Sequence, residues 1–412
     1  MSLNFPKKLL VLVTIIAAIF IRFYNFPQRV NYGPEQAMSL ITSGRNVSDK
    51  FSLLGQRYLR ETASGHILFS GAVFNYSLIP LQLVFGFDPI PITGYFGFLN
   101  VTTGVLLFFA VKKFFDLKTA FLSSFLFLFN SLMVYHSLFI WNYNYLPLLS
   151  ILILYFLWRG RKKGKSLSAG IVGFLVGVGI SLQYLFILPF IVTFFLMLKF
   201  SREKVKTLFL FMAGTLLGNF PMVLFDLRHD FYHVRTLLIY LNENTPGFDF
   251  SYYHFLYLWP IFFIIGGIFL AKVSKKFPRA SVLLTGIYVF INLNSGLVSF
   301  KGPVGMLQGL TADEILSAAE KIAEENPGNF NIVSTLDFDA RGHVLRYPLE
   351  FISKFKPRSV EEYASLDAIY VLAKVDYNFE NSSLWELSEF RPYKTSLFYE
   401  IDENYAIFKL QK

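Results

Sequence analysis

The residues best suited to chemistry in this 412-residue chain lie between its apolar segments rather than within them. Glu35 and Gln36 follow a Tyr-Gly-Pro turn, where a helix is expected to begin. A carboxylate there could accept a proton from an acceptor hydroxyl within hydrogen-bond reach. A negative charge is also stabilised at a helix N-terminus by the helix dipole alone. Glu35 is the candidate base and Gln36 a candidate substrate contact, with a structural role as the alternative.

Cationic side chains follow in the same polar segment. Arg57, Arg60 and His66 could hold a phosphate, because a guanidinium presents a fork of donors that matches phosphate oxygens. Arginine near a membrane surface also contacts anionic lipid headgroups. The sequence leaves both interpretations open.

A second polar segment begins at Asp226 and runs through Arg228, His229 and Asp230 to His233. Its acidic and imidazole groups suggest a metal site, but their spacing matches no familiar zinc pattern. Arg228, with His229 beside it, is the better candidate for contact with a phosphate or a sugar. The alternative is a charged collar at the end of a span. We predict no metal ion and no cofactor.

A third cluster, Trp141-Asn142-Tyr143-Asn144, opens an apolar segment close to His136. Indole and amide groups suit a sugar-binding surface, so Trp141, Asn142 and Asn144 are candidate sugar contacts. Trp and Tyr are also enriched at bilayer interfaces because their rings are amphipathic. The cluster therefore supports a sugar site only together with other evidence.

The elements that must position these groups are predicted membrane helices. Hydrophobic residues make up 54% of the chain and charged residues 16%, below the roughly 25% of a soluble globular protein. About nine apolar runs approach the ~20 residues, with ~17 as the minimum, that a spanning helix needs. They cover residues 6–24, 91–111, 119–139, 142–158, 168–184, 185–200, 207–225, 254–271 and 280–298. The first run ends at Arg22 and Tyr24, and we predict an uncleaved span there.

Basic residues between the spans give the predicted orientation. They cluster near the N-terminus and in the turns at 112–118, 159–165, 199–206 and 272–279. The positive-inside bias places all of these turns in the cytoplasm. That parity requires the apolar stretch 66–86 to lie in the interface or re-enter. The net charge of +10 thus arises from short loops, which argues against a nucleic-acid surface.

Residues 301–412 are predicted to form a small extracytoplasmic α/β domain, after a transmembrane domain at residues 1–300. A capping box at Thr311 and Glu314 opens a helix that should end near Asn326. Strands are expected at 331–335 and 367–373, with a terminal hairpin at 395–410. The predicted fold class is an all-α polytopic transmembrane bundle of about nine spans plus an interfacial helix segment, carrying this domain.

The order of these features resembles a known family. The chain begins with the first span, which is followed by the acidic outer segment and a Gly-bearing interfacial stretch ending in Pro. Next come a span with Asn100, the basic turn 111–115 and the span start at Trp141. This order resembles the GT-C superfamily of membrane glycosyltransferases, in particular its protein O-mannosyltransferase and aminoarabinose-transferase branch. The resemblance covers about residues 5–235.

The resemblance implies a function and a location. Such proteins transfer a sugar from a polyprenyl-phosphate carrier to an acceptor hydroxyl or amine on the outer side of the membrane. Their first outer loop bears an acidic residue, typically Asp followed by Glu or Gln, and Glu35-Gln36 is the matching pair. The implied partners are the lipid bilayer, a polyprenyl-phosphate-linked sugar and a glycan, lipid or protein acceptor. The implied location is the plasma membrane, with the N-terminus in the cytoplasm.

Two other functions remain open. A transporter would need ionisable residues facing a cavity at mid-membrane, and the predicted spans hold few. No inverted repeat is apparent either. A non-catalytic membrane binding or scaffold protein with a GT-C-like fold is the second alternative.

Overall fold

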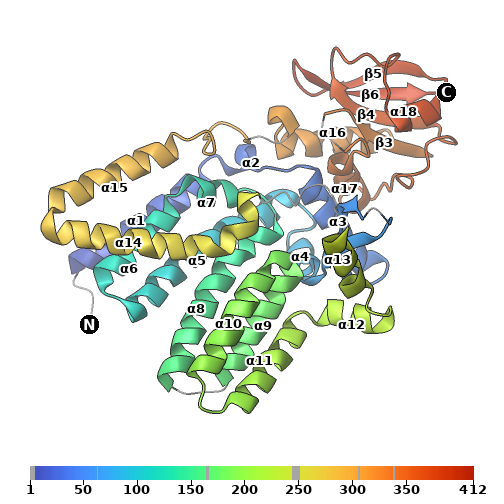
Figure 1. The fold of residues 1–412 in the computed structure, drawn as a ribbon. Coiled ribbons are helices and arrows are strands. Elements are labelled where there is room, and N and C mark those ends of the chain that lie inside the picture. The colour runs from blue at the N-terminus through green and yellow to red at the C-terminus, as the bar shows by residue number, and fades with distance from the viewer. Residues whose placement is uncertain (1–4, 63, 164–166, 244–250, 305–306, 337–338) are drawn as a thin grey trace.

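Long apolar helices fill one end of the molecule, and a mixed sheet lies at the other (Figure 1). The computed structural model describes residues 5–62, 64–163, 167–243, 251–304, 307–336 and 339–412. The apolar helices are α1 (Phe5–Phe23), α5 (Pro89–Phe114), α6 (Leu117–Leu128), α7 (Ser131–His136), α8 (Leu146–Lys163), α9 (Leu167–Leu182), α10 (Ile187–Phe200), α11 (Lys204–Gly218), α14 (Trp259–Lys276) and α15 (Pro278–Leu293).

The nine predicted spans fall on these helices, but few of the helices alone are long enough to cross a bilayer. By length and composition, the described residues hold two such helices, Pro89–Phe114 and Tyr252–Lys276. A third arises if α11 and α12 (Phe220–Arg228) form one bent span. The count of nine stays a prediction.

Two of the predicted spans are broken rather than straight. The helices α11 and α12 meet at an angle of 82°. Pro221 lies in the first turn of α12 and lacks the N–H that would continue the hydrogen bonds of α11. Span 119–139 breaks between α6 and α7, where the Asn130 side chain accepts a hydrogen bond from Met133 N (3.3 Å). Capping by Asn130 thus starts a new helix inside the apolar run.

The stretch 66–86 forms a strand and a short helix. Strand β2 (Ile67–Gly71) pairs antiparallel with β1 (Leu54–Glu61), and α4 (Val73–Val84) follows with 12 residues. A helix of this length spans about 18 Å, well short of the ~30 Å hydrocarbon core. The stretch therefore does not cross as a helix, as the predicted orientation requires.

Short elements connect the apolar helices to the sheet domain. The helices α2 (Phe26–Arg29), α3 (Pro34–Ser48), α4 and α13 (Tyr232–Asn242) lie in this region (Figure 1). The 3-10 helices are η1 (Asn142–Tyr145), η2 (Tyr184–Phe186), η3 (Tyr252–Leu258) and η4 (Leu307–Gly309).

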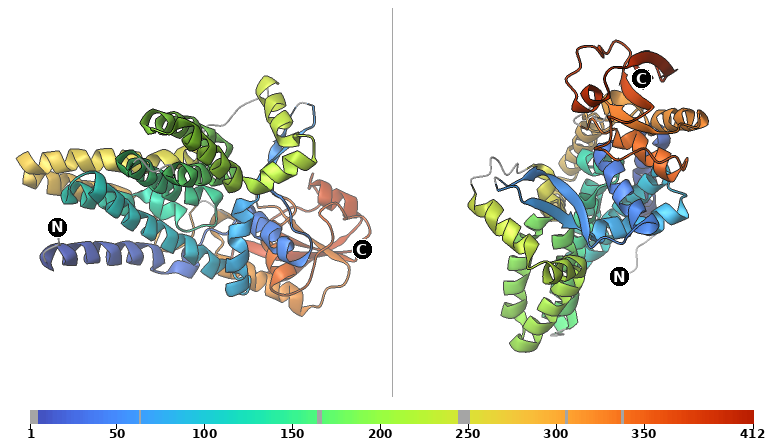
Figure 2. Two further views of the ribbon diagram at one scale, coloured as in Figure 1. Left: turned by 90° about the horizontal axis from the view of Figure 1, so that it is seen from below. Right: turned by 90° about the vertical axis from the view of Figure 1, so that its right-hand side faces the viewer.

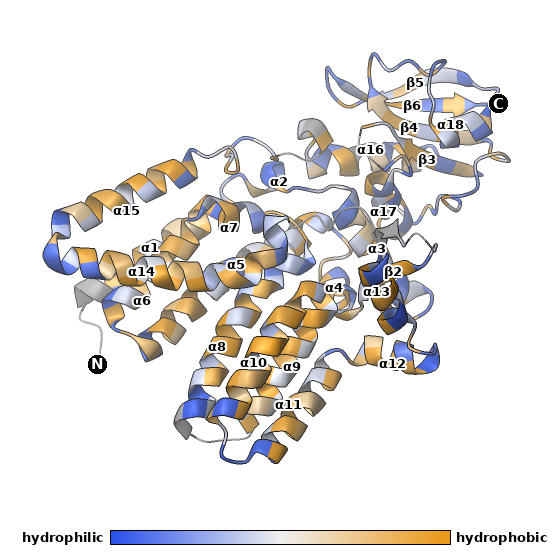
Figure 3. Ribbon diagram, viewed as in Figure 1, coloured by the Kyte–Doolittle hydropathy of each residue, from blue (hydrophilic) through white to orange (hydrophobic). Residues whose placement is uncertain are grey.

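The basic turns gather at the ends of the helices that are remote from the sheet domain. The turns α10–α11 and α14–α15 are hydrophilic and lie far from it (Figure 3), and the first turn of α1 lies at the opposite end of the molecule from the sheet (Figure 2). Asp116 and Lys275 interact electrostatically, so the turns α5–α6 and α14–α15 are neighbours. Arg161 lies 4.9 Å from the centroid of the Phe200 ring, which joins the ends of α8 and α10. This arrangement is the one that the positive-inside prediction needs.

Helices α9 and α11 pack through glycines. A Cβ on Gly173 would lie 2.1 Å from the carbonyl oxygen of Phe211, and one on Gly214 would lie 2.2 Å from that of Gly170. Gly177 and Gly218 repeat the pattern one turn further along. Paired glycines four residues apart allow membrane helices to approach through their backbones.

The C-terminal part holds α16 (Ala312–Glu324), β3 (Phe330–Ser334), α17 (His343–Phe351), β4 (Ala368–Lys374), α18 (Trp385–Phe390), β5 (Lys394–Glu400) and β6 (Tyr405–Gln411). Its sheet has the order β3-β4-β6-β5, with β3 and β4 parallel and the other pairs antiparallel. Thr311 and Glu314 form the predicted capping box. The predicted helix, strands and hairpin of this part are confirmed, and the boundary at residue 300 stays a prediction.

Candidate functional site

The first turn of α3 holds Glu35, outside the predicted spans. Pro34 begins the helix, because its fixed φ suits the first helical position and its missing N–H is not needed there. Gly33 N donates to Gln36 Oε1 (3.1 Å), and Gln36 Nε2 donates to the carbonyl oxygen of Ile140 (3.4 Å). Both polar ends of the Gln36 side chain are thus used within the protein, and they fix the start of α3 beside Trp141.

The Glu35 side chain is half-buried. Among the described residues, none forms a hydrogen bond or an ion pair with its carboxylate. Burial raises the pKa of Glu35 above its ordinary value, since a charged carboxylate is poorly solvated there. The carboxylate also interacts electrostatically with the phenol of Tyr135. A desolvated carboxylate is a better proton acceptor than an exposed one, and no cation lies beside this one within the part of the chain that the structure describes.

A group of rings, which we call the aromatic cluster, lies around the segment that Gln36 contacts and includes rings of the neighbouring η3. The ring of Trp141 stacks on His136 with centroids 5.5 Å apart, and Tyr253 lies 4.8 Å from Trp141. Tyr252 approaches His136 edge-on at 6.0 Å. The members of the aromatic cluster are His136, Phe139, Trp141, Tyr143, Tyr252, Tyr253 and His254.

Hydrogen bonds of the amide side chains hold this cluster in place. Asn142 Nδ2 donates to the carbonyl oxygen of Leu182 (2.6 Å), and Asn144 Nδ2 donates to that of Phe139 (2.8 Å). These bonds tie η1 to the end of α9 and to the turn after α7. The two predicted sugar contacts Asn142 and Asn144 therefore have a structural task as well.

Two buried polar groups of the cluster and its neighbours have a polar atom without a hydrogen-bond partner among the described residues. One is Gln183 Oε1, and the other is a ring nitrogen of His136, whose imidazole also interacts with the Asn144 side chain. Buried polar atoms are nearly always paired, so these two atoms are candidates for hydrogen bonds with a substrate. A sugar, which carries several hydroxyl groups, is a suitable partner for acceptors of this kind.

Gln183 has a partner that its sequence context does not indicate. Gln183 Nε2 lies 3.0 Å from His254 Nδ1, and Tyr143 Oη lies 3.3 Å from the same nitrogen. The available signal was the run Tyr252-Tyr253-His254, which opens a span with aromatic and polar residues as Trp141 does. Nothing in the sequence joins residues 183 and 254, because their contact exists only in the folded bundle.

The hairpin β1–β2 joins α3 to α13. Gln56 Nε2 donates to the Glu35 carbonyl oxygen (3.3 Å) and to Ser39 Oγ (2.7 Å). At the other side of the hairpin, Tyr232 Oη forms hydrogen bonds with the backbone N–H and carbonyl of Ile67, both at 3.2 Å. The hairpin is thus held between the helix of the candidate base and the second polar segment.

The cationic candidates lie on this hairpin and on the segment it contacts. Arg57 is exposed on β1 next to Gln56, and His66 Nδ1 lies 3.0 Å from Ser64 Oγ. The side chain of Arg60 lies outside the described residues. Arg228 is exposed at the end of α12.

The Asp and His groups near Arg228 hold the turn between α12 and α13. Asp226 Oδ1 accepts a hydrogen bond from His233 N (2.8 Å) and lies 3.5 Å from His233 Nδ1. The exposed His229 instead stacks on Phe225, with ring centroids 4.0 Å apart. Within the described ranges, no group of three or more His, Asp or Glu side chains is arranged to hold a metal ion.

The predicted residues therefore form two groups. Glu35 and Gln36 lie beside the aromatic cluster with Trp141, Asn142 and Asn144. Arg57, His66, Arg228 and His229 lie along the hairpin and the α12–α13 turn.

Comparison with known proteins places the fold. No protein-family model and no curated protein matches the chain. Two solved structures of ArnT from Cupriavidus metallidurans, an aminoarabinose transferase of the GT-C type, are similar to it. The apo structure has a TM-score of 0.56 at 9% identity, and the structure bound to undecaprenyl phosphate has 0.52 at 10%, each covering 98% of both chains. The chain has a GT-C-like fold, and the likeness includes the C-terminal part beyond residue 235.

Proposed function

We propose that this protein is a membrane glycosyltransferase of the cell envelope. It would transfer a hexosyl or pentosyl group from a polyprenyl-phosphate carrier to an acceptor on the outer side of the membrane. The observation that carries this proposal is the half-buried carboxylate of Glu35, which has no partner among the described residues and interacts with Tyr135 next to the aromatic cluster. The fold shared with ArnT supports it, and one ArnT structure holds undecaprenyl phosphate, a carrier of this class.

In the proposed reaction, Glu35 accepts the proton of an acceptor hydroxyl or amine. The acceptor oxygen or nitrogen then forms a bond to the anomeric carbon of the sugar. The bond between that carbon and the phosphate oxygen breaks, and its electron pair leaves with the polyprenyl phosphate. Attack opposite to the leaving group inverts the anomeric configuration. Burial favours this role, because a raised pKa makes the Glu35 carboxylate a stronger base at neutral pH.

We assign the sugar to the aromatic cluster. The half-buried indole of Trp141 offers an apolar face to sugar C–H groups. Gln183 Oε1, which has no partner among the described residues, can accept a hydrogen bond from a sugar hydroxyl. Asn144 Oδ1 can accept another through its second lone pair while the side chain interacts with His136. Asn142, whose Nδ2 already holds Leu182, would keep η1 in position. A site built for hydroxyl groups discriminates strongly against sugars that lack them.

We assign the carrier phosphate to Arg57, Arg60 and Arg228, with His66 and His229 nearby. Arg228→Ala and Arg57→Ala should each raise the KM for the carrier about tenfold, because a hydrogen bond to a charged group contributes roughly 1.5–3 kcal/mol. The kcat at saturating carrier should change less than about threefold. Steady-state kinetics with a labelled carrier measure both constants.

The control for this prediction is Arg202→Ala, an exposed arginine in the turn between α10 and α11. It should leave the KM unchanged. An unchanged KM in both Arg57→Ala and Arg228→Ala would remove these residues from the carrier site.

The function itself is tested with the purified full-length protein in proteoliposomes. The liposomes receive a panel of labelled polyprenyl-phosphate sugars and candidate acceptors. We expect the label to leave at least one carrier and free polyprenyl phosphate to accumulate in equal amount. Binding of carriers without any transfer across the panel would contradict the proposal and favour the binding or scaffold alternative.

A further inference from the structure

We propose that helix α17 of the C-terminal part is a positioning element for Glu35. It would pack against the face of α3 opposite Glu35, so that the carboxylate stays beside the aromatic cluster. This inference rests on the proposed function of Glu35. It gives the C-terminal part a task in the reaction at the membrane surface.

Glu35 lies on one face of α3, and α17 packs against the opposite face. Gly44 follows Glu35 by nine residues, which is two and a half turns of a helix with 3.6 residues per turn. Gly44 faces α17, whereas Gln56 of β1 bonds the backbone at Glu35 and the side chain of Ser39. A displacement of α17 would therefore change the distance between the Glu35 carboxylate and the aromatic cluster.

The contact at Gly44 is too close for any side chain. A Cβ there would lie 2.5 Å from Cε1 of the Phe351 ring. That ring stacks on Phe87 with centroids 5.5 Å apart, and Tyr347 Oη donates to the Phe87 carbonyl oxygen (2.7 Å). Phe351 is therefore held on its other side, and the distance between α3 and α17 is set by Gly44.

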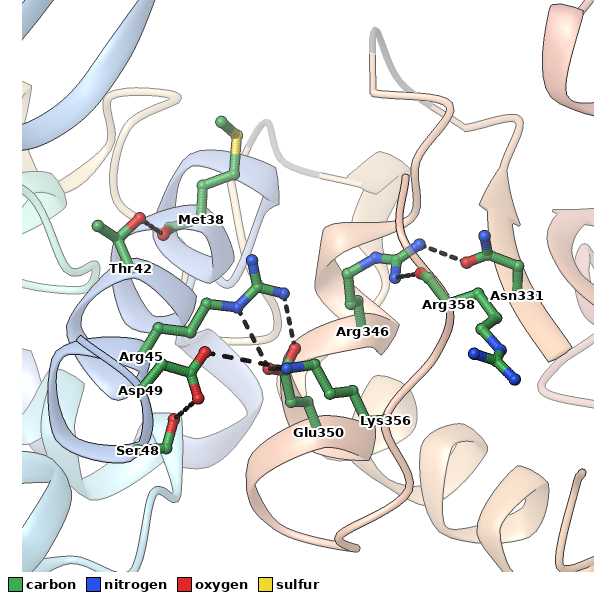
Figure 4. Close-up of polar contacts among 10 residues, drawn as sticks. All are labelled: Met38, Thr42, Arg45, Ser48, Asp49, Asn331, Arg346, Glu350, Lys356 and Arg358. Atoms are coloured by element: carbon green, nitrogen blue, oxygen red, sulfur yellow. Dashed lines mark hydrogen bonds and ion pairs between the residues drawn. The ribbon is translucent and has the colours of Figure 1, made fainter. Parts of the chain in front are cut away.

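An ionic network fixes the register of the two helices (Figure 4). Arg45 Nε and Nη2 donate to the two carboxylate oxygens of Glu350 at 3.2 and 2.9 Å. Lys356 Nζ lies 3.4 Å from Glu350 Oε1 and 3.9 Å from Asp49 Oδ2. The Glu350 side chain is only 7% exposed, whereas Arg45 is 43% exposed, so water reaches the pair from the arginine side. The two-pronged geometry therefore contributes mainly to the register of the helices. Removing Arg45 would leave the buried Glu350 carboxylate with Lys356 as its remaining partner.

Helix α17 is in turn fixed within its own domain. The buried Arg346 donates from Nη2 to Asn331 Oδ1 of β3 (2.5 Å) and from Nη1 to the carbonyl oxygen of Arg358 (2.6 Å), as Figure 4 shows. At the other end of the contact, Tyr32 Oη donates to the carbonyl oxygen of Val344 (3.2 Å). The sheet domain thus supports α17, and α17 contacts the second half of α3 at Gly44 and Arg45 and the segment just before α3 at Tyr32.

Kinetics of full-length variants in proteoliposomes test this inference. Gly44→Val should lower kcat at least about tenfold, since a misplacement of about 1 Å can cost a hundredfold in rate. The KM for the carrier should stay within about twofold, because the cationic candidates lie on other elements. Glu350→Gln, which keeps the side-chain volume, should lower kcat less, and Glu350→Asp less still.

The matched control is Gly286→Val on α15, where nothing lies within 4 Å of the added Cβ. It should keep the wild-type kcat. Wild-type kcat in a folded Gly44→Val protein would overturn the inference. If Gly44→Val does not fold, Glu350→Gln decides the question, and wild-type kinetics in that variant overturn it as well.

A second readout needs no turnover. Glu35→Gln is introduced into the wild type, into Gly44→Val and into Glu350→Gln. For each of these three proteins, the change in Tm that Glu35→Gln causes is measured as a function of pH. Because burial raises the pKa of Glu35, this difference reports how buried its carboxyl group is. We expect Gly44→Val and Glu350→Gln to change it. If this Tm difference is the same in the variants as in the wild-type background, the inference is overturned. If it changes in the variants but the wild-type protein transfers no sugar, α17 still positions Glu35 and only the proposed function is contradicted.

Discussion

Glu35→Gln should lower the rate of sugar transfer by about 10²–10⁴-fold, the usual contribution of a general base. The amide keeps the shape of the side chain but cannot accept the proton of the acceptor. The KM for the carrier should change little, since no phosphate contact is assigned to Glu35. The measurement is kcat with a labelled carrier at saturation. The control is Glu203→Gln, an exposed glutamate in the turn between α10 and α11, which should be silent.

The pH dependence of the transfer rate in the wild type and in Glu35→Gln gives a separate check. Burial raises the pKa of Glu35, so wild-type activity should rise with pH through that elevated pKa rather than through the ordinary range near ~4.3. Retention of more than about half of the wild-type kcat in Glu35→Gln would rule out Glu35 as the base.

The same substitution should stabilise the folded protein at neutral pH. A carboxyl group whose pKa is higher in the folded than in the unfolded state lowers stability once the pH rises through the folded pKa. Glu35→Gln removes that penalty, so its Tm should exceed the wild-type Tm at neutral pH. The gain should vanish below the unfolded pKa of ~4.3, where both side chains are neutral. Thermal unfolding in detergent measures this, and an equal gain at all pH values would contradict it.

Gly214→Val should destabilise the helical bundle more than any substitution at the candidate site. The added Cβ would meet the Gly170 carbonyl oxygen at 2.2 Å and Phe174 N at 2.8 Å, which are backbone atoms that no rotamer change can move. Helices α9 and α11 would have to separate along their whole contact. Overpacking commonly costs about 1–3 kcal/mol when side chains can adjust, and we expect more than about 3 kcal/mol here.

The measurement is the yield of monodisperse protein and its Tm, beside those of Gly286→Val. Both variants place a β-branched residue in a helix, but Gly286 has nothing within 4 Å of its added Cβ. A similar Tm for the two variants would show that the α9–α11 contact is not set by glycine.

Local signals were sufficient for the start of α3 and for most of the C-terminal part. Pro34 and Glu35 mark a helix start, and the capping box at Thr311 marks another, because these preferences depend on neighbours in the sequence. The breaks at Asn130 and Pro221 were not predicted, since hydropathy alone does not register a cap or a proline within an apolar run.

Contacts between distant segments were beyond the sequence. Arg22 was expected at the edge of the first span, yet it is fully buried and donates from Nε and Nη2 to Asn100 Oδ1 (3.2 and 2.8 Å). The approach of Gln183 to His254 likewise depends on how the bundle folds. In contrast, the pairs Gly173/Gly177 and Gly214/Gly218 were readable signals of close helix packing.

Glu35 can meet a carrier and an acceptor outside the cell only if α3 and the sheet domain face away from the cytoplasm. The chain has no cysteine, so single cysteines can be labelled without background. Exposed positions suit this test, and we choose Arg161→Cys, His229→Cys and Glu403→Cys. A membrane-impermeant maleimide added to intact cells should label positions 229 and 403, and position 161 only after permeabilisation. Labelling of positions 161 and 403 from the same side would contradict the proposed reaction centre.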